Sequence, residues 1–296
     1  MGSLQEGNRE MRIFVIGAGA AGGSMALGLH KAGHAVLGIS DIDEDRASNA
    51  AKRVQTKAFA SSLPRELISA ETVIVAVPDP LISQVASRAV EMDVVEPSQV
   101  WLHLSGAFGA DELGDVATRA SGVAALHPAT VFAPGVFTEI PPDTVFAIDG
   151  NCQSALDAAA FLGKSLGGKT VHVPSALRPL YHASTVLASN CVVALLGEAR
   201  ALLVKNGLPE KDAEEIAVSL AKSAIMRADA VGLDASLSGP IQRGNVGTVE
   251  RHLDALSGDL EHREIYAVLG RATLRLACRN GSISETQRAD LENKLN

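Results

Sequence analysis

Met11 to Gly23 reads MRIFVIGAGAAGG, and the first half of the chain is organised around these residues. The apolar run Ile13 to Ile16 has the length of one buried parallel strand. Three glycines follow at G-x-G-x-x-G spacing, and Ser24 to Leu29 continues as a helix of small residues. A strand, a glycine turn and a helix in this order predict a dinucleotide-binding loop. The alternative is a strand-turn-helix unit with a purely structural role.

The three glycines have different expected roles. Gly17 permits the tight turn, Gly19 lets the backbone approach a pyrophosphate, and Gly22 lets the helix pack on the strand. Amides at the start of the helix face the phosphates, where the helix dipole favours negative charge. The residues expected to bind the cofactor in this loop are Gly17, Ala18, Gly19, Ala20, Ala21 and Gly22.

Composition limits what the chain binds. Its 296 residues suffice for two domains, and with 3% aromatic residues the cores must consist of Ala, Val, Leu and Ile. A net charge of −8 gives no general attraction to nucleic acid or to an anionic membrane. No uncharged apolar run is long enough to span a bilayer, and residues 1–10 read as a polar, flexible leader. The scattered Cys152, Cys191 and Cys278 predict no disulfide framework and no metal site, which favours a cytoplasmic protein.

Strand and helix patterns alternate up to Pro174, and only helical patterns follow. The alternation predicts an α/β domain with a parallel, doubly wound sheet, followed by an all-helical domain. The expected strands are 13–16, 35–40, 56–59, 72–77, 99–104, 122–126, 145–148 and 170–173. The expected helices are 24–29, 45–53, 81–90 and 154–166 in the first domain, and 177–206, 210–231, 246–256 and 260–279 in the second.

The second strand ends at Ser40-Asp41-Ile42-Asp43. An acidic side chain at this place accepts hydrogen bonds from the adenosine ribose and disfavours a 2′-phosphate, which favours NAD over NADP. The alternative is that Asp41 or Asp43 only caps the next helix. Arg46, one turn into that helix, is instead suited to a phosphate, so either NAD or NADP remains open.

Ligands of doubly wound sheets bind beyond the carboxyl ends of the strands. Val77, Pro78 and Asp79 end the fourth strand and are expected to form a backbone wall along the cofactor. Ser105 and Gly106 end the fifth strand, where the hydroxyl touches substrate or nicotinamide, or merely forms a turn. His127 ends the sixth strand and has either a substrate or catalytic role, or a structural one.

The segment from Ala183 to Gly197 contains no charged residue, which predicts a helix buried on nearly all sides. His182, Thr185, Ser189 and Asn190 nevertheless share one side of this helix at 100° per residue. Buried polar groups need partners, so this stripe predicts a wet cleft, with a helix–helix hydrogen-bond network as the alternative.

Within the stripe, His182 is our candidate proton donor and Asn190 the group that orients the substrate. Tyr181 either faces the same cleft or packs against its neighbours. Farther along, Gly and Pro interrupt the helical pattern over residues 238–245. Arg243 in this break either holds a carboxylate or phosphate or remains solvated.

As a set, these motifs make the chain resemble the 6-phosphogluconate dehydrogenase-like superfamily of NAD(P)-dependent oxidoreductases. Within it, the chain is similar to a family that pairs a Rossmann-like domain with a helical C-terminal domain of unknown function. The motifs carrying the resemblance are Gly17 to Gly22, Val75-Ala76-Val77-Pro78-Asp79, His103-Leu104-Ser105-Gly106, Leu126-His127-Pro128, Leu180-Tyr181-His182-Ala183, Ser189-Asn190, Ser238-Gly239-Pro240 and Arg243-Gly244.

The resemblance implies hydride transfer between a nicotinamide and a small carbonyl, imine or hydroxy acid. Some members look like ketopantoate reductase, and others are similar to pyrroline-5-carboxylate reductase in architecture. Homodimers built through the helical domains are usual in the superfamily. The resemblance therefore implies a dinucleotide-binding Rossmann domain over residues 11–174 and a helical substrate and dimerisation domain over residues 175–296.

The chain departs from these relatives at two positions. Many of them place a catalytic lysine four residues before the asparagine, where this chain has Val186, so we assign proton donation to His182. Close family members often carry a basic residue near Asp41 that suits NADP, whereas the residue here is acidic.

Together with these residues, the resemblance implies a ketopantoate reductase-like oxidoreductase that acts on a small, anionic substrate. We expect His182 to supply the proton, Asn190 and Ser105 to position the reacting group, and Arg243 to hold the anion. His127, Ser189 and Tyr181 complete the expected substrate site, and Gly106 lies beside the cofactor. An imine or pyrroline-5-carboxylate reductase and a non-catalytic NAD(P) sensor are the alternatives.

Overall fold

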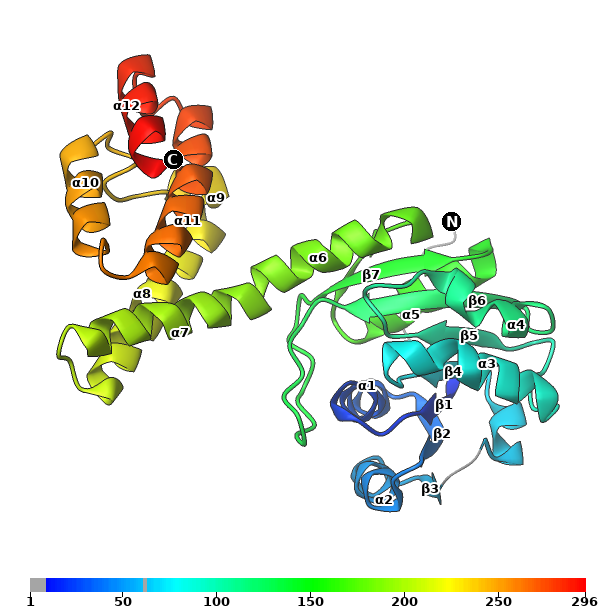
Figure 1. Ribbon diagram of the computed structural model, residues 1–296. Helices are drawn as coiled ribbons and strands as arrows, with labels where there is room; N and C mark the ends of the chain where they lie inside the picture. The colour runs from blue at the N-terminus through cyan, green and yellow to red at the C-terminus, as the bar shows by residue number, and fades with distance from the viewer. Residues whose placement is uncertain (1–8, 61–62) are drawn as a thin grey trace. The chain divides into compact units, whose positions relative to one another are not determined.

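The computed structural model describes residues 9–60 and 63–296. The leader expected over residues 1–10 lies outside this described part except for its last two residues. The chain divides into two compact units, one ending at Ser189 and the other running from Asn190 to Asn296 (Figure 1).

The first unit is built on a single sheet of eight strands within the described residues. They are β1 (Arg12–Ile16), β2 (Ala35–Asp41), β3 (Lys57–Ala60), β4 (Thr72–Val75), β5 (Val100–His103), β6 (Gly122–Pro128), β7 (Val145–Gly150) and β8 (Lys169–His172). Their order is β3-β2-β1-β4-β5-β6-β7-β8, so the chain reverses its direction of travel across the sheet between β1 and β4. Ligands of such sheets bind at the carboxyl ends next to this reversal.

One pair of strands differs from the predicted parallel sheet. β6 and β7 run antiparallel, whereas every other neighbouring pair is parallel among the described strands. Residues 129–144 between β6 and β7 form no helix. A parallel return needs a long crossover, usually a helix, so the chain turns back beside β6 instead.

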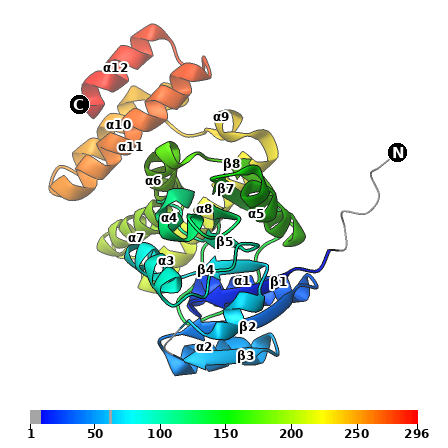
Figure 2. The same ribbon diagram turned by 90° about the vertical axis from the view of Figure 1, so that its right-hand side faces the viewer.

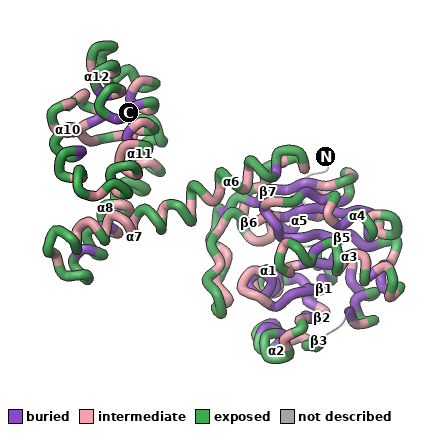
Figure 3. Tube along the Cα trace, in the orientation of Figure 1, coloured by how far each residue is buried: buried purple, intermediate pink, exposed green. Residues whose placement is uncertain are grey.

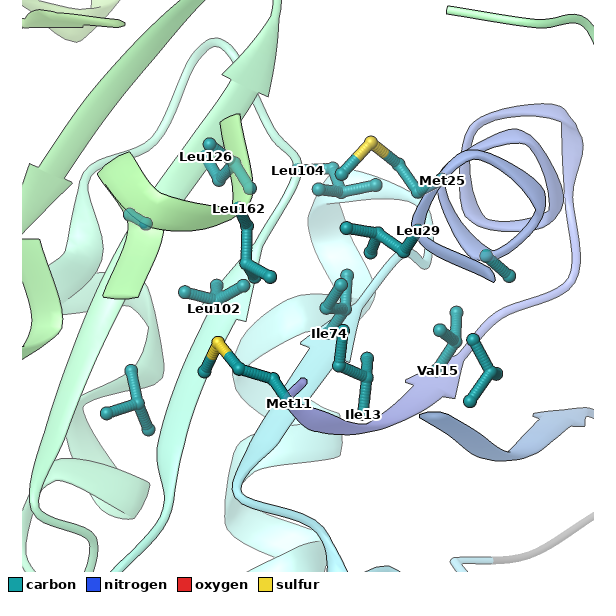
Figure 4. Packing of buried hydrophobic residues seen from close by; sticks show 14 of the residues in the cluster. Met11, Ile13, Val15, Met25, Leu29, Ile74, Leu102, Leu104, Leu126 and Leu162 are labelled. Atoms are coloured by element: carbon teal, nitrogen blue, oxygen red, sulfur yellow. The ribbon is translucent and has the colours of Figure 1, made fainter. Parts of the chain in front are cut away.

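Helices cover both faces of the sheet (Figure 2). They are α1 (Ala20–Lys31), α2 (Glu44–Arg53), α3 (Ile82–Glu91), α4 (Gly114–Ala117) and α5 (Gln153–Ser165). A further helix of this unit, α6 (Arg178–Ala188), follows β8. Ile13 and Val15 face a core with Met25 of α1 and Leu162 of α5 (Figure 4). Phe14 and Ile16 point into a second core, on the opposite face, which includes residues of α3 and α4. Burial on both faces explains the unbroken apolar run of β1.

The second unit consists of helices within its described residues, as the sequence predicts. They are α7 (Asn190–Lys205), α8 (Glu210–Val231), α9 (Leu233–Ser236), α10 (Val246–Ala255), α11 (Leu260–Arg279) and α12 (Glu285–Leu295). Its core contains Ile241, Val249, Leu253, Leu274, Leu291 and Leu295.

The single helix expected over residues 177–206 is two helices in the structure. α6 ends at Ala188, Ser189 has φ −125° and ψ −74°, and α7 begins at Asn190. After β8, near Pro174, the chain forms only helices in its described residues. The division into compact units falls later, after Ser189, because α6 belongs to the first unit. The domain boundary at residues 174 and 175 therefore stays a prediction.

The expectation that this segment is buried on nearly all sides is wrong for the isolated chain. Within Ala183 to Gly197, Leu187 of α6 is 67% exposed and Val193 of α7 is 71% exposed. Both helices are largely exposed or half-buried along their length (Figure 3). Absence of charge predicted an apolar segment correctly, but these apolar side chains are exposed rather than buried.

The segment from Ser175 to Lys205 also bears on the expectation that no run could span a membrane. It is 31 residues long with a window of mean hydropathy 1.6, so by length and composition alone it is sufficient to cross a bilayer. Core helices of soluble proteins pass the same test, so this one segment is weak evidence for a membrane span.

Candidate active site

Gly17 and Gly22 allow the close backbone contacts within and beside the loop after β1. Gly17 has φ +100°, and its amide donates to the Ser40 carbonyl at 2.7 Å. A Cβ on Gly17 would lie 2.3 Å from the Ala76 carbonyl oxygen, and one on Gly22 would lie 2.0 Å from the Gly17 carbonyl oxygen. Backbone atoms would have to move for either, so both glycines are required by the loop itself.

Gly19 differs from the other two glycines. It is the N-cap of α1, and a Cβ at this position would meet nothing within 4 Å. The first turn of α1 therefore opens toward free space over Gly19, with its amide groups unpaired within the helix. These residues fit the pyrophosphate of a dinucleotide, which a helix N-terminus of this kind binds.

Of the two roles expected for Asp41 and Asp43, Asp43 caps the next helix and Asp41 lies beside the glycine loop. Asp43 caps α2 by accepting from the Arg46 amide at 3.1 Å, and its carboxylate also pairs with the Arg46 side chain at 2.9 Å. Asp41 instead accepts from the Ala18 amide at 2.7 Å, so its carboxylate is tied to the glycine loop. Asp41 is thus held where β2 ends beside this loop, the place from which an acidic residue reaches an adenosine ribose.

The backbone after β4 lies against the same loop. Ala76 donates to the Ile16 carbonyl at 2.7 Å, and its own carbonyl lies next to Gly17. Val77 packs on the core, and Pro78 precedes a short 3-10 turn that begins at Asp79. The stretch has the position that a wall along the cofactor requires.

Two buried polar residues shape the turn after β5. The Ser105 amide donates to Nδ1 of His103 at 3.2 Å, so Nδ1 carries no proton and Nε2 donates to the Gly109 carbonyl at 2.7 Å. Burial lowers the pKa of His103, which keeps the ring neutral. The Ser105 hydroxyl oxygen accepts a hydrogen bond from the Ala107 amide at 3.2 Å, so Ser105 forms the turn that was one of its two expected roles. The hydroxyl proton of Ser105 is available to a ligand.

Two histidines converge on Gly106. A Cβ on Gly106 would lie 2.6 Å from Nδ1 of His182 and 2.8 Å from Nε2 of His127. The two rings are edge-to-face with centroids 6.1 Å apart. Residues from two different strand ends and from α6 thus line one space, which only a residue without a side chain leaves open.

Tyr181 holds the other nitrogen of His127. Its hydroxyl lies 2.8 Å from Nδ1 of His127, and the two rings are edge-to-face at 5.6 Å. Burial, followed by repulsion from His182 and from the Arg178 guanidinium, lowers the pKa of His127 to about 4. His127 is therefore neutral at pH 7, with one ring nitrogen protonated.

Arg178 was not predicted from the sequence. Its side chain is fully buried, with Nε donating to the Val173 carbonyl at 3.1 Å and Nη2 to the Ala147 carbonyl at 3.2 Å. Its guanidinium lies 5.8 Å from the centre of the Tyr181 ring, and Nη1 has no hydrogen-bond partner in the described residues. A signal was present, because Arg178 is the only Lys, Arg, Asp or Glu between Lys169 and Glu198.

The remaining predicted residues lie around or after the break in the helix. The Ser189 hydroxyl donates to the Thr185 carbonyl at 2.8 Å, and Asn190 starts α7 in the second unit. Arg243 is exposed in the turn between Gly239 and α10, also in the second unit. The first unit thus brings together His127, Tyr181, His182 and Gly106, while a meeting with Asn190 and Arg243 stays a prediction.

Comparison with known families matches the two parts of the chain separately. Residues 3–128 match the Rossmann-like domain, and residues 144–273 match a domain of unknown function, DUF2520. The chain carries a Rossmann-like domain followed by a DUF2520 domain. The DUF2520 match begins before β7, so it takes in strands of the sheet as well as helices. No curated protein matches the chain.

Several solved structures share the fold. Protein TM1727 from Thermotoga maritima is 24% identical with a TM-score of 0.71, over 90% of this chain and 98% of that one. The putative NADP oxidoreductase BF3122 from Bacteroides fragilis is 18% identical with a TM-score of 0.69, over 90% and 98%. A 1-pyrroline-5-carboxylate reductase from Streptococcus pyogenes is 19% identical with a TM-score of 0.59, over 93% and 99%. At these low sequence identities, the structural similarity shows a common fold and nothing more.

Proposed function

We propose that this protein is an NAD(P)-dependent oxidoreductase that reduces a small 2-oxo acid, or oxidises the corresponding 2-hydroxy acid, as ketopantoate reductase does. One observation carries the proposal: a dinucleotide-type glycine loop after β1 and a pair of histidines around Gly106 after β5 lie at carboxyl ends of the same sheet. Structures with the same fold include a protein titled NADP oxidoreductase and pyrroline-5-carboxylate reductases. Membership of the 6-phosphogluconate dehydrogenase-like superfamily is part of this proposal.

The cofactor is held by the loop from Gly17 to Gly22 and by the residues beside it. Ser40 and Asp41 end β2, Val77 to Asp79 form the wall, and Gly106 leaves space at the histidines. When bound, the nicotinamide supplies or accepts the hydride. Asp41, tied to the Ala18 amide, favours an unmodified ribose, so we propose NAD in preference to NADP.

His182 donates the proton that the reduction requires. As the carbonyl carbon gains a hydride, its oxygen takes this proton and becomes a hydroxyl group. Ser105 and His127 hold that oxygen from the strand side, since Ser105 precedes Gly106 in the turn after β5 and Nε2 of His127, from β6, borders the same glycine. In this proposal Asn190 orients the reacting group and the Arg243 guanidinium binds the substrate carboxylate.

Activity assays test the proposal directly. NADH and NADPH binding is measured by fluorescence, and turnover is measured with 2-ketopantoate and with 1-pyrroline-5-carboxylate. His182→Ala is expected to lower kcat by about 100-fold or more, the usual contribution of a general acid. His252→Ala, which alters a histidine of the second unit, is the control. Turnover unchanged in His182→Ala with the best substrate would refute the assigned role.

Two alternatives predict different results in the same assays. A pyrroline-5-carboxylate-type reductase would turn over the cyclic imine and leave the 2-oxo acid unchanged. A non-catalytic NAD(P) sensor would bind the nucleotide without oxidising it in the presence of any substrate.

We also propose that the protein is a cytoplasmic homodimer formed through its helical unit. Apolar side chains on α7 and α8 support this, since Val193, Leu220 and Met226 are 71%, 68% and 71% exposed. Exposed apolar surface on neighbouring helices is typical of surfaces that associate.

A further inference from the structure

We propose that Arg178 and Tyr181 fix His127 in the tautomer with the proton on Nε2, so that this N–H faces the substrate and selects a carbonyl oxygen over a protonated imine. This inference rests on the proposed oxidoreductase function for its substrate. The assignment of the tautomer rests on the first unit alone.

The argument begins with the hydrogen bond between Tyr181 and His127. Nδ1 of His127 lies 2.8 Å from the Tyr181 hydroxyl, and this is the one hydrogen bond of that hydroxyl among the described residues. If Nδ1 carried the proton, it would donate to the phenol oxygen, and the phenol proton would have no acceptor. With the phenol donating to a bare Nδ1, both groups are satisfied, and the proton of the neutral ring is on Nε2.

Arg178 favours the same arrangement. Its guanidinium lies 5.8 Å from the centre of the Tyr181 ring, where a positive charge stabilises negative charge developing on the phenol oxygen. The group cannot turn away, because it is fully buried and bonded to the Val173 and Ala147 carbonyls. Burial raises the pKa of Tyr181 and the Arg178 guanidinium opposes that rise, so the guanidinium favours the phenol as a donor over the phenol as an acceptor.

Burial of Arg178 is costly, which supports a role beyond packing. A buried guanidinium loses its hydration, and Nη1 regains no partner within the described residues. Apolar residues of similar size often replace buried charges without loss of stability. Features that cost stability in this way occur mainly where a site needs them.

The consequence for the ligand follows from the geometry at Gly106. Nε2 of His127 borders the space beside Gly106, so a donor faces whatever group lies there. A carbonyl oxygen accepts this hydrogen bond. A protonated cyclic imine has an N–H and no lone pair, so two donors would face each other and one would be left without an acceptor, which weakens binding about tenfold or more.

The chain contains a matched control for the decisive variant. Its two tyrosines both pair with a histidine Nδ1, since the Tyr266 hydroxyl lies 2.9 Å from Nδ1 of His252. The two ring pairs have the same edge-to-face geometry at 5.6 Å. Tyr181→Phe and Tyr266→Phe therefore remove the same hydrogen bond, one at the site and one in the second unit.

The first measurement needs no substrate. ¹⁵N-NMR of the histidine rings at pH 7 is expected to show His127 protonated on Nε2 in the wild-type protein, and a mixture of tautomers in Tyr181→Phe. Arg178→Met is expected to shift His127 in the same direction, and Tyr266→Phe is expected to leave it unchanged. A proton on Nδ1 of wild-type His127 would overturn the inference, whatever the enzyme assays show.

The second measurement compares kcat/KM for 2-ketopantoate and 1-pyrroline-5-carboxylate with NADH. We expect the wild type to prefer the ketone by about tenfold or more, and Tyr181→Phe to reduce this ratio about tenfold. A wild-type preference for the imine, or a ratio that Tyr181→Phe leaves unchanged, would overturn the selection of carbonyl substrates. Failure to oxidise NADH with either compound would instead contradict the proposed function, and the NMR result would still decide the tautomer.

Discussion

At the scale of single residues, the glycines of the first loop serve two separate needs. Gly17 and Gly22 are required because backbone atoms occupy the places where their side chains would be. Gly19 has open space around it, so no contact within the protein requires a glycine at this position. A bound ligand would require one. The sequence motif contains all three glycines, and the backbone contacts show that only Gly17 and Gly22 are required by the fold.

This difference predicts opposite results for two alanine variants. Gly22→Ala is expected to lower the free energy of unfolding by about 2 kcal/mol or more, because a Cβ placed 2.0 Å from the Gly17 carbonyl forces the loop to move. Gly19→Ala is expected to leave stability within about 0.5 kcal/mol and to weaken NADH binding at least tenfold. Urea denaturation and NADH titration of both variants measure this. Undiminished NADH affinity in Gly19→Ala would contradict a pyrophosphate at this position.

His127 predicts a dependence of stability on pH. Its pKa is about 4 in the folded protein, below the usual 6.5, so between these values the unfolded chain binds a proton that the folded chain does not. Stability from the neutral ring is complete above pH 6.5 and is lost as the pH falls toward 4. Between pH 7 and pH 4, the wild type should lose about 2–3 kcal/mol more than His127→Gln.

Denaturant unfolding of both proteins across this pH range provides the measurement. The lowered pKa values of His34 and His103 affect both proteins equally, so they cancel in the difference. Parallel stability curves for the two proteins would show that His127 titrates normally.

At the scale of elements, α12 is a helix that periodicity does not reveal. Of its residues, Leu291 and Leu295 enter the core of the second unit, and these two apolar positions are too few for a clear pattern. The start of the helix does have a sequence signal, because Ser284 and Gln287 form a capping box. The missed helix could therefore be found from its cap rather than from its apolar face.

The cap gives a prediction for this element. Ser284→Ala removes the hydroxyl that accepts from the Gln287 amide at 3.2 Å, and it should lower the free energy of unfolding by about 1 kcal/mol. Thermal or urea unfolding measures the change. Ser219→Ala, at an exposed position inside α8, serves as the control and is expected to have no such effect. Equal stability of the two variants would argue against the cap.

At the scale of the whole molecule, the exposed apolar helices are the main departure from expectation. The sequence predicts a buried helix from the lack of charge between Ala183 and Gly197, and one chain leaves much of that surface open. In the proposed homodimer, a second copy of the chain covers it. Burial of these apolar side chains therefore depends on association with another chain in this proposal.

Double substitution of Leu220 and Met226 by glutamate tests this association. Both side chains are largely exposed on α8, so the change should leave the fold intact and convert the proposed dimer to a monomer. Sedimentation velocity measures the mass, and circular dichroism checks the fold. Val131→Glu, at a 73% exposed position of the first unit, should remain dimeric. A monomeric wild type would refute the proposed dimer.

The sequence alone determined the order and type of most elements and the glycine loop, because these depend on local spacing. Strands buried on both faces appear as short apolar runs, and glycines mark turns wherever they occur. For the same reason, α8 and α11 were predicted over the residues that form them, Glu210–Val231 and Leu260–Arg279. His127 and His182 were chosen as candidates by their places at a strand end and on a helix.

Only the tertiary structure decided which of these residues meet. The antiparallel pairing of β7 with β6 and the hydrogen bond from the buried Arg178 to the Ala147 carbonyl are contacts between segments that are distant in sequence. Gly106 lies between His127 and His182 because the sheet brings the strand ends and α6 together. Arg178 lies beside Tyr181 because the two residues are three positions apart on α6. A hydrogen bond such as the one between Tyr181 and His127 forms only when folding has placed both groups, and this placement sets the chemistry available to the site.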